Sequence, residues 1–346
     1  MEFPQVFFVE HDEDERGAAV ALARALHDLG IERPFLIASR YGESLTTELQ
    51  AAGAEQTPSR GADQDWASGL GERARNADAD AIVAIGGGRR LDVAKLAAAR
   101  AGLINIAVPT QLSHDGICSP VAVVPNADGL AESLGAIAPH AVVVPLPTLM
   151  HAPVPSLAAG LGDLLANPLA LRDWALAAER GLEDIHQQAW NLSTESFEAV
   201  QDFLDQDPAE SEKDPAFLRH LADALVLSGM SMICSGTSRP ASGGEHEISH
   251  AIDEIYGGRA MHGAQVAFGC LVSIALYGDD VEPFKKRLRT LGLPAHPSEL
   301  GLSTDDIVKV ILAAPDTRPG RFTILEDAEL DDARARALVR KIWDEE

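Results

Sequence analysis

The chain has 346 residues, of which 46% are hydrophobic, and it carries 28 Lys and Arg against 53 Asp and Glu, a formal net charge of −25 at pH 7. This length and apolar content are typical of a globular enzyme with one or two domains, and they exclude a disordered chain. A chain this acidic is expected to bind neither nucleic acid nor anionic membranes.

The sequence contains no long apolar run of the kind that spans a membrane, and its N-terminus lacks a basic stretch followed by an apolar one. Neither membrane insertion nor a secretory signal is therefore expected. The three cysteines, Cys118, Cys234 and Cys270, are odd in number and lie in apolar surroundings, which is typical of reduced, buried thiols. The sequence predicts a cytoplasmic protein.

The first 145 residues alternate short apolar runs with helical patterns. Strands are predicted at 6–9, 34–38, 81–85, 104–108, 121–124 and 141–144, and helices at 18–29, 42–52, 66–76 and from a triple glycine to residue 101. This alternation predicts an α/β domain with a mainly parallel sheet.

A segment with four prolines, residues 145–155, predicts the domain boundary. Beyond it the periodicity is helical, with helices predicted at 156–166, 168–180, 183–205, 215–235, 244–255, 262–277, 281–291, 304–313 and 330–343. We expect a dinucleotide-binding α/β domain over residues 1–150 and an all-helical, metal- and substrate-binding domain over 151–346. The site is expected in the cleft between them.

The strand at 81–85 leads through Gly86, Gly87 and Gly88 into a helix. Glycines let backbone amides approach an anion closely, and a helix N-terminus adds a favourable dipole, so this turn predicts a pyrophosphate site. It matches neither the G-x-G-x-x-G fingerprint nor a Walker loop, and a tight turn without a ligand is the alternative. Further candidates for cofactor binding are Asp92, Thr110 and Ser113.

The loop after the strand at 104–108 lies where ligands bind in open parallel sheets. Asp115 in this loop is therefore a candidate catalytic residue that binds substrate hydroxyls or the nicotinamide end of a cofactor. His114 beside it is interpreted as a loop residue that caps a turn.

The second strand ends at Ser39 and Arg40, where an acidic residue would normally hold the ribose of NAD. A serine and an arginine could accept the 2′-phosphate of NADP, although Arg40 could equally be a solvated loop residue. We expect NADPH to be used at least as well as NADH.

Histidines gather in the helical part. His246 and His250 are four residues apart and so share a helix face, and His262 follows a glycine turn. With Asp163, His246 and His262 form a three-ligand set that leaves a coordination position open, as in catalytic metal sites. For Asp163, a first-turn residue favoured by the helix dipole is the alternative. Unrelated surface histidines are the alternative. Asn167, which precedes a proline, is predicted to be an N-cap rather than a fourth ligand.

The chain resembles the sn-glycerol-1-phosphate dehydrogenases, which form a larger group with the iron-containing alcohol dehydrogenases, metal-dependent polyol dehydrogenases and dehydroquinate synthases. The similar segments are the triple-glycine turn, Ser113–Gly116, Gly160–Asp163, Ser238–His246, Met261–Gly263 and Arg318–Leu325. The resemblance implies a dehydroquinate synthase-like fold, with a doubly wound N-terminal domain and an all-helical C-terminal domain. It also implies NAD(H) or NADP(H), one divalent metal and a homo-oligomer. Zn²⁺ is expected, with Ni²⁺ or Fe²⁺ as alternatives.

Carried onto this chain, the resemblance makes Asp163, His246 and His262 the metal ligands, in agreement with the pattern above. It puts the pyrophosphate at the triple glycine and the reacting polyol near Asp115. Iron-containing relatives have a histidine ligand where this chain has Asn167. In addition, Arg89-Arg90 stand where a lysine and an apolar residue are more usual.

The predicted reaction is the NAD(P)H-dependent reduction of dihydroxyacetone phosphate to sn-glycerol 1-phosphate, with the metal polarising the carbonyl. Another polyol or alcohol dehydrogenase of the same fold, or a sugar-phosphate cyclase, is the alternative. Arg239, Arg318 and Arg321 are candidates for binding the substrate phosphate, each with a surface salt bridge as the alternative. His250 could donate a proton to the substrate or hydrogen-bond it.

Overall fold

The structure is a computed structural model that describes residues 3–10, 15–39, 42–58, 62–127, 129 and 131–343. Arg40, a predicted cofactor residue, lies outside this part of the chain. The main sheet is fully parallel, with the strand order β1 (Gln5–Val9), β8 (Ala141–Pro145), β5 (Ile104–Pro109), β4 (Ala81–Gly86), β2 (Pro34–Ala38) and β3 (Gly53–Gln56). All six residues of β4 are buried, as expected for a parallel strand covered on both faces.

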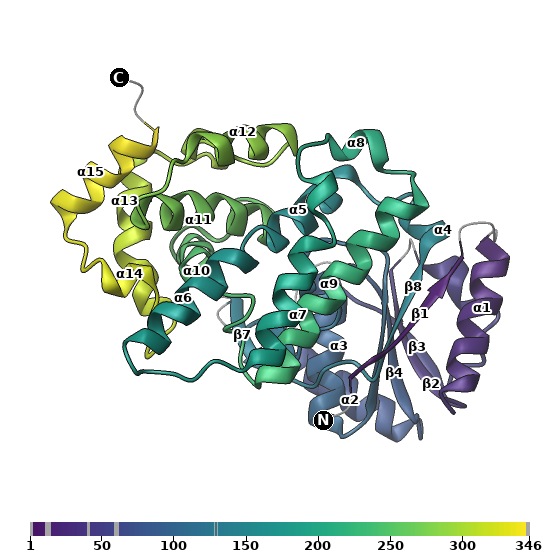
Figure 1. Cartoon of the computed structure of the whole chain (residues 1–346). Coiled ribbons are helices and arrows are strands. Elements are labelled where there is room, and N and C mark those ends of the chain that lie inside the picture. The colour runs from purple at the N-terminus through teal and green to yellow at the C-terminus, as the bar shows by residue number, and fades with distance from the viewer. Residues whose placement is uncertain are drawn as a thin grey trace.

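Helices cover both faces of this sheet. Ile82 and Ala84 of β4 pack in one apolar core with α2 (Gln64–Asn76) and α3 (Gly88–Ala101), whereas Val83 and Ile85 pack in a second core with α1 (Glu15–Asp28). The predicted doubly wound α/β arrangement is therefore confirmed. Figure 1 shows this layer at one end of the molecule, with α1 on its outer side.

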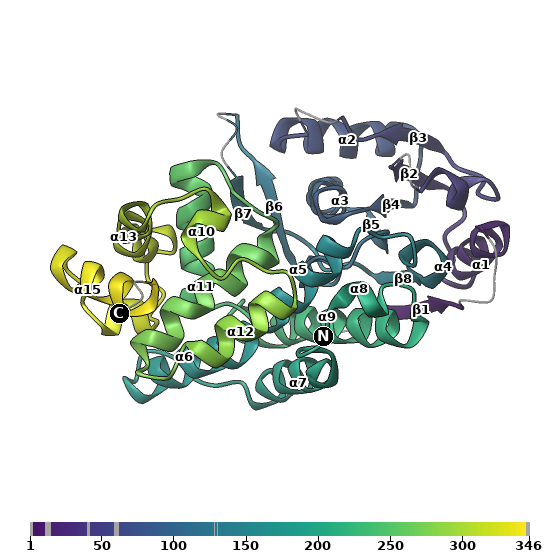
Figure 2. The same ribbon diagram turned by 90° about the horizontal axis from the view of Figure 1, so that it is seen from above.

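The rest of the chain is helical. Its α-helices are α4 (Leu146–Leu149), α5 (Val154–Leu164), α6 (Asn167–Glu179), α7 (Gln187–Glu198), α8 (Pro208–Ser211), α9 (Pro215–Ser235), α10 (Gly244–Tyr256), α11 (His262–Leu276), α12 (Glu282–Thr290), α13 (Thr304–Ala313), α14 (Ile324–Asp327) and α15 (Asp332–Trp343). Short 3₁₀ turns are η1 (Glu43–Thr46), η2 (Asp115–Ile117), η3 (Gln201–Phe203), η4 (Pro297–Leu300) and η5 (Ala314–Thr317). Seen from above, most of these helices lie to one side of the sheet (Figure 2), whereas α4 and α9 pack against the end of the sheet formed by β1 and β8. The division into two domains near residue 150 stays a prediction.

Three predicted elements differ from the structure. The helix predicted at 42–52 is only the turn η1, and the strand β3 follows it. The helix predicted at 183–205 is divided into α7 and η3. The strand predicted at 121–124 is β6 (Val121–Pro125), which does not join the main sheet but pairs antiparallel with β7 (Ala131–Gly135) in a separate hairpin.

Two segments, Val154–Glu179 and Pro215–Ser235, are long and apolar enough to cross a membrane, but 83% and 67% of an 18-residue apolar window in each are buried inside the fold. They are therefore core helices by their packing and give little support for membrane insertion. Cys118, Cys234 and Cys270 are free and buried, as predicted.

Candidate metal and substrate site

Asp163, His246 and His262 come from three different helices, α5, α10 and α11. Glycines on α11 allow these helices to approach closely. A Cβ at Gly263 would lie 1.9 Å from the carbonyl oxygen of Ala159 on α5, and one at Gly269 would lie 2.4 Å from the carbonyl oxygen of Glu245 on α10. Only glycine fits at these two contacts, so Gly263 and Gly269 allow α11 to pack closely against both α5 and α10.

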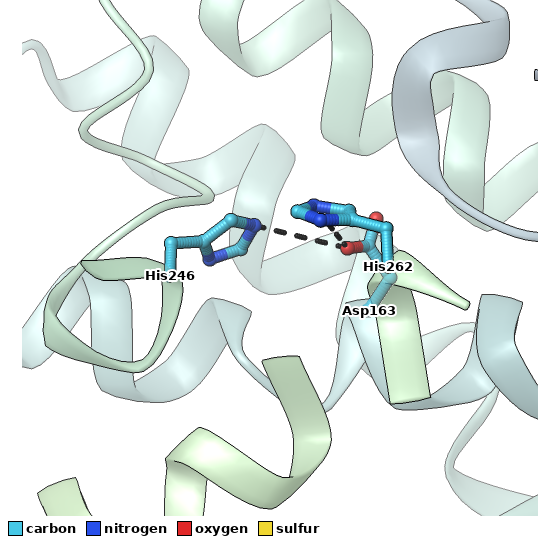
Figure 3. Close-up of side chains that lie close together, drawn as sticks. All are labelled: Asp163, His246 and His262. Carbon is cyan, nitrogen blue, oxygen red and sulfur yellow. Dashed lines mark ion pairs between the residues drawn. The ribbon is translucent and has the colours of Figure 1, made fainter. Parts of the chain in front are cut away.

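The three side chains meet at one point (Figure 3). Asp163 Oδ1 lies 3.8 Å from His246 Nε2 and 3.7 Å from His262 Nε2. Tetrahedral coordination with bonds of about 2.0–2.1 Å would put ligand atoms about 3.3 Å apart, so contraction by a few tenths of an ångström would enclose a metal ion. Asp163 Oδ1 is buried and has no hydrogen-bond partner among the described residues. The donor set therefore fits a divalent metal.

Glu245 orients one of these ligands. Its buried Oε1 lies 2.9 Å from His246 Nδ1 and also accepts a hydrogen bond from the Gly243 amide at 2.6 Å. A carboxylate at Nδ1 fixes the imidazole tautomer in which Nε2 carries the lone pair, as in many carboxylate–histidine–metal arrangements. His246 therefore presents Nε2 toward Asp163 and His262.

The electrostatics of the cluster favour a bound cation. Burial, followed by the charge of Asp115, raises the pKa of Asp163 well above its usual value. Asp163 lies near the C-terminal end of α5, so the alternative of a first-turn residue is excluded and the helix dipole also disfavours its negative charge. Burial lowers the pKa values of His246 and His262, which keeps both imidazoles neutral, the form that binds metals.

A cavity of about 230 Å³ opens beside the three ligands. Residues from the sheet side and from the helical side line it together, among them Arg89, Asp92, Asp115, His250 and Arg318. The hairpin β6–β7 contributes Val123 and Ser133 to its wall. The cavity thus lies between the two parts of the chain, where the sequence predicted the site.

Arg318 forms hydrogen bonds with three polar side chains that line the cavity. Its Nη1 donates hydrogen bonds to Ser238 Oγ at 2.9 Å and to Ser242 Oγ at 3.0 Å, and its Nε donates to His250 Nδ1 at 3.3 Å. No described residue accepts a hydrogen bond from its Nη2, so that donor remains for a ligand. Arg321 donates to Ser238 Oγ and to the Ser242 carbonyl but does not line the cavity.

Comparisons with known proteins show the family of this chain. Residues 15–153 match the family model described as iron-containing alcohol dehydrogenase. The chain is 35% identical to a glycerol-1-phosphate dehydrogenase, NAD(P)+, of Cenarchaeum symbiosum over 278 residues, which are 80% of this chain and 77% of that protein. It is 37% identical to the protein of the same name from Hyperthermus butylicus, over 81% and 79% of the two chains. The chain belongs to the glycerol-1-phosphate dehydrogenase family.

Solved structures support the fold of this family member. The crystal structure of a probable glycerol dehydrogenase from Sinorhizobium meliloti superimposes with a TM-score of 0.78 at 21% identity, over 98% of this chain and 96% of that one. NAD(P) and a metal are consistent with the family. The donor set of Asp163, His246 and His262 agrees with the metal.

The structure does not support one of the three arginines proposed for the substrate phosphate. The guanidinium of Arg239 is 2% exposed and forms a two-pronged ion pair with Glu183, and its Nη1 donates to the Phe322 carbonyl at 2.7 Å. Arg239 is absent from the lining of the cavity. In this glycerol-1-phosphate dehydrogenase family member its interactions are those of a buried structural ion pair.

Asn167 is the first residue of α6 and makes no side-chain cap, so the predicted N-cap is wrong. Its amide nitrogen instead donates to Ser196 Oγ at 2.7 Å and to Ser228 Oγ at 3.2 Å. The Ser228 hydroxyl donates to Asp115 Oδ2, and the Asp115 amide donates to Asp163 Oδ2, both at 2.9 Å. Asn167 is therefore the start of a chain of hydrogen bonds that ends at the candidate metal ligand Asp163.

The predicted cofactor residues lie along the carboxyl edge of the sheet. Gly86 ends β4, Gly87 is the N-cap of α3, and Gly88 is its first residue. Ser39 is buried at the end of β2, and the Thr110 amide donates to the Gly86 carbonyl at 3.0 Å. Two further residues are buried near the cavity: Asp92, which pairs with Lys95 at 2.8 Å, and Ser113.

The sequence did not indicate the contact of Glu245 with His246, and His114 does more than cap a turn. Glu245 directly precedes His246, a spacing that on a helix does not predict a contact. His114 Nδ1 accepts a hydrogen bond from the Gly116 amide at 3.0 Å, which confirms the turn cap, but its ring also lines the cavity 5.8 Å from the ring of His262.

Proposed function

We propose that this protein interconverts dihydroxyacetone phosphate and sn-glycerol 1-phosphate with NAD(P)H and one divalent metal. The single observation that carries the proposal is the set of Asp163, His246 and His262, which meet beside a cavity that also contains an unsatisfied guanidinium donor of Arg318. The names of the curated relatives support the same reaction. Because these relatives are named as dehydrogenases, the sugar-phosphate cyclase alternative is not favoured.

Asp163, His246 and His262 would hold the metal, and the N-terminus of α3 would hold the cofactor pyrophosphate. Gly87 provides no side-chain cap there, and no acidic residue occupies the first turn of α3, so the helix end is open to an anion. Once bound, the metal supplies Lewis-acid polarisation of a carbonyl and NAD(P)H supplies a hydride. We propose Zn²⁺, since two neutral imidazoles and one carboxylate are a frequent ligand set of catalytic zinc.

Arg318 would bind the substrate phosphate. Its planar guanidinium is held in place by Ser238, Ser242 and His250, so little side-chain entropy is lost when an anion binds. Arg321, whose burial lowers its pKa to about 10, would keep the two serines in place and add positive charge. Asp115 would border the reacting end of the substrate.

His250 would hydrogen-bond the substrate rather than protonate it. Its Nδ1 accepts from Arg318, so the single proton of the neutral imidazole is at Nε2. Burial, followed by the charge of Arg318, lowers the pKa of His250 well below its usual value. A neutral imidazole is a poor proton donor but a good hydrogen-bond donor.

The test is an assay of the zinc-loaded protein with dihydroxyacetone phosphate and NADPH or NADH, followed by oxidation of each glycerol phosphate enantiomer. We expect turnover of sn-glycerol 1-phosphate and not of sn-glycerol 3-phosphate. Turnover of glycerol alone would instead identify a neutral polyol dehydrogenase. Cyclisation of a heptulosonate phosphate would identify a cyclase.

We also propose that the protein is a cytoplasmic homo-oligomer. The free, buried cysteines support a reducing compartment. The oligomer is proposed from the family resemblance alone, and light scattering of the purified protein tests it.

A further inference from the structure

Arg89 and Arg90, in the first turn of α3, are the only two consecutive arginines in the sequence. Cations at a helix N-terminus oppose the helix dipole, and two adjacent guanidinium groups also repel each other. Burial, followed by the charge of Arg89, lowers the pKa of Arg90. Burial and the Arg89 charge thus both disfavour the charged guanidinium of Arg90, and an anion bound beside Arg90 would stabilise it.

The side chain of Arg90 lies over the end of strand β4. A Cβ built on Gly86 would be 2.5 Å from Arg90 Cδ, so the arginine occupies the side of the sheet to which that Cβ would point. The neighbouring strand β2 is in register, since Ala38 pairs with Ile85 and the Ser39 amide donates to the Ile85 carbonyl at 2.9 Å. Residues in register on parallel strands point to the same face, so Ser39 and Arg90 share that face.

Three polar groups at this edge lack partners. Arg90 Nε, Ser39 Oγ and Thr57 Oγ1 are buried and have no hydrogen-bond partner among the described residues. Thr57 follows strand β3, whose last residue pairs with Ala38, so it continues the register next to Ser39. The side chains of Ser39 and Thr57 are 2% and 7% exposed. Buried polar atoms normally have partners. Among the described residues, two hydroxyls that follow β2 and β3 and one guanidinium nitrogen on α3 have none, and a bound acceptor would satisfy all three.

The strand order gives the direction in which a dinucleotide must lie. With its pyrophosphate at the N-terminus of α3, the cofactor extends on one side toward β5 and on the other toward β2. The loop after β5 contains Asp115, which adjoins the metal ligands, so the nicotinamide lies on that side. The adenosine ribose must then lie over the ends of β2 and β3.

We infer that Arg90, together with Ser39 and Thr57, binds the 2′-phosphate of NADP and thereby sets the preference for NADPH. A guanidinium and two hydroxyls are suitable donors for a phosphate dianion, and no acidic side chain stands at Ser39 to hold the ribose of NAD. The inference deepens the proposed function, since it assumes a nicotinamide cofactor at the triple-glycine turn.

Isothermal titration of the metal-free protein with 2′,5′-ADP and with 5′-ADP tests this inference without turnover. The wild type should bind 2′,5′-ADP more tightly. Arg90→Gln should weaken 2′,5′-ADP binding about 10- to 100-fold, the loss expected for a charge-assisted contact, and change 5′-ADP binding little. Arg90→Lys should give an intermediate loss. Arg24→Gln, at an exposed arginine of α1, is the matched charge control and should change neither.

Three results would overturn the inference. Equal weakening of both nucleotides by Arg90→Gln would show that Arg90 binds the pyrophosphate. Loss of discrimination in Arg40→Gln but not in Arg90→Gln would assign the phosphate to Arg40. A wild type that binds both nucleotides equally would show that no such pocket exists. Failure of the proposed reaction with intact discrimination between the nucleotides would refute only the reaction.

Discussion

Substitution of Glu245 by Gln should raise the stability of the metal-free protein and lower its affinity for metal. Burial raises the pKa of its carboxyl from 4.5 to about 7. Because the folded pKa exceeds the unfolded one, the metal-free protein should lose stability as the pH rises from about 4.5 to about 7, by about 3 kcal/mol in all. Glu245→Gln removes this penalty and should stabilise the metal-free protein at about pH 8, but not at about pH 4.5.

The same substitution should weaken metal binding. The neutral amide is a poorer acceptor for His246 Nδ1 than the carboxylate at 2.9 Å, and the loss of such an orienting carboxylate typically costs about 10- to 100-fold in metal affinity. Urea midpoints of stripped protein at both pH values and zinc competition against a chelator measure the two effects. Glu179→Gln, at an exposed glutamate ending α6, is the control. Wild-type zinc affinity in Glu245→Gln, or an unchanged pH slope of stability, would refute this reasoning.

Four other substitutions test the candidate metal ligands, the substrate contacts and the helix packing separately. His262→Ala should abolish zinc retention and activity together, which elemental analysis beside an activity assay checks; full activity without metal would contradict the ligand set. Arg318→Ala should raise KM for dihydroxyacetone phosphate about 10- to 100-fold more than for dihydroxyacetone, whereas Arg239→Ala should leave that ratio unchanged and lower the unfolding free energy by about 3 kcal/mol in urea. Gly263→Ala should separate α5 from α11 and lower both the thermal midpoint and the zinc content; wild-type values for both would show that the helices can move apart freely.

The buried strands were predictable because a parallel strand that is covered on both faces has a continuous run of apolar residues in its sequence. The sequence Ala81–Gly86 is such a run and is fully buried. Strand β3 was not predictable in this way. Its residues, Gly53-Ala54-Glu55-Gln56, form the edge of the sheet with half of their side chains exposed, and only pairing with β2 makes them a strand.

The grouping of His246 and His262 was predictable from the sequence because only one helix and a glycine turn separate them. Other parts of the site depend on long-range packing that no spacing encodes. The partner of Arg239 is Glu183, on a loop between α6 and α7. The roles of the cofactor and phosphate residues are still predictions.

Hydrogen bonds connect the loop that contains Asp115 to helices of both the sheet part and the helical part of the chain. The Asp115 amide donates a hydrogen bond to Asp163 on α5, and Asp115 Oδ2 accepts one from Ser228 on α9. Lys95 on α3 donates a hydrogen bond to the Gly116 carbonyl at 2.9 Å. A hinge motion at this end of the cleft would break several buried hydrogen bonds at once, each costing about 1–3 kcal/mol. The metal end should therefore behave as a rigid template that selects substrates by shape. We expect any motion that opens the cavity to the cofactor to occur instead in the wall formed by the hairpin β6–β7.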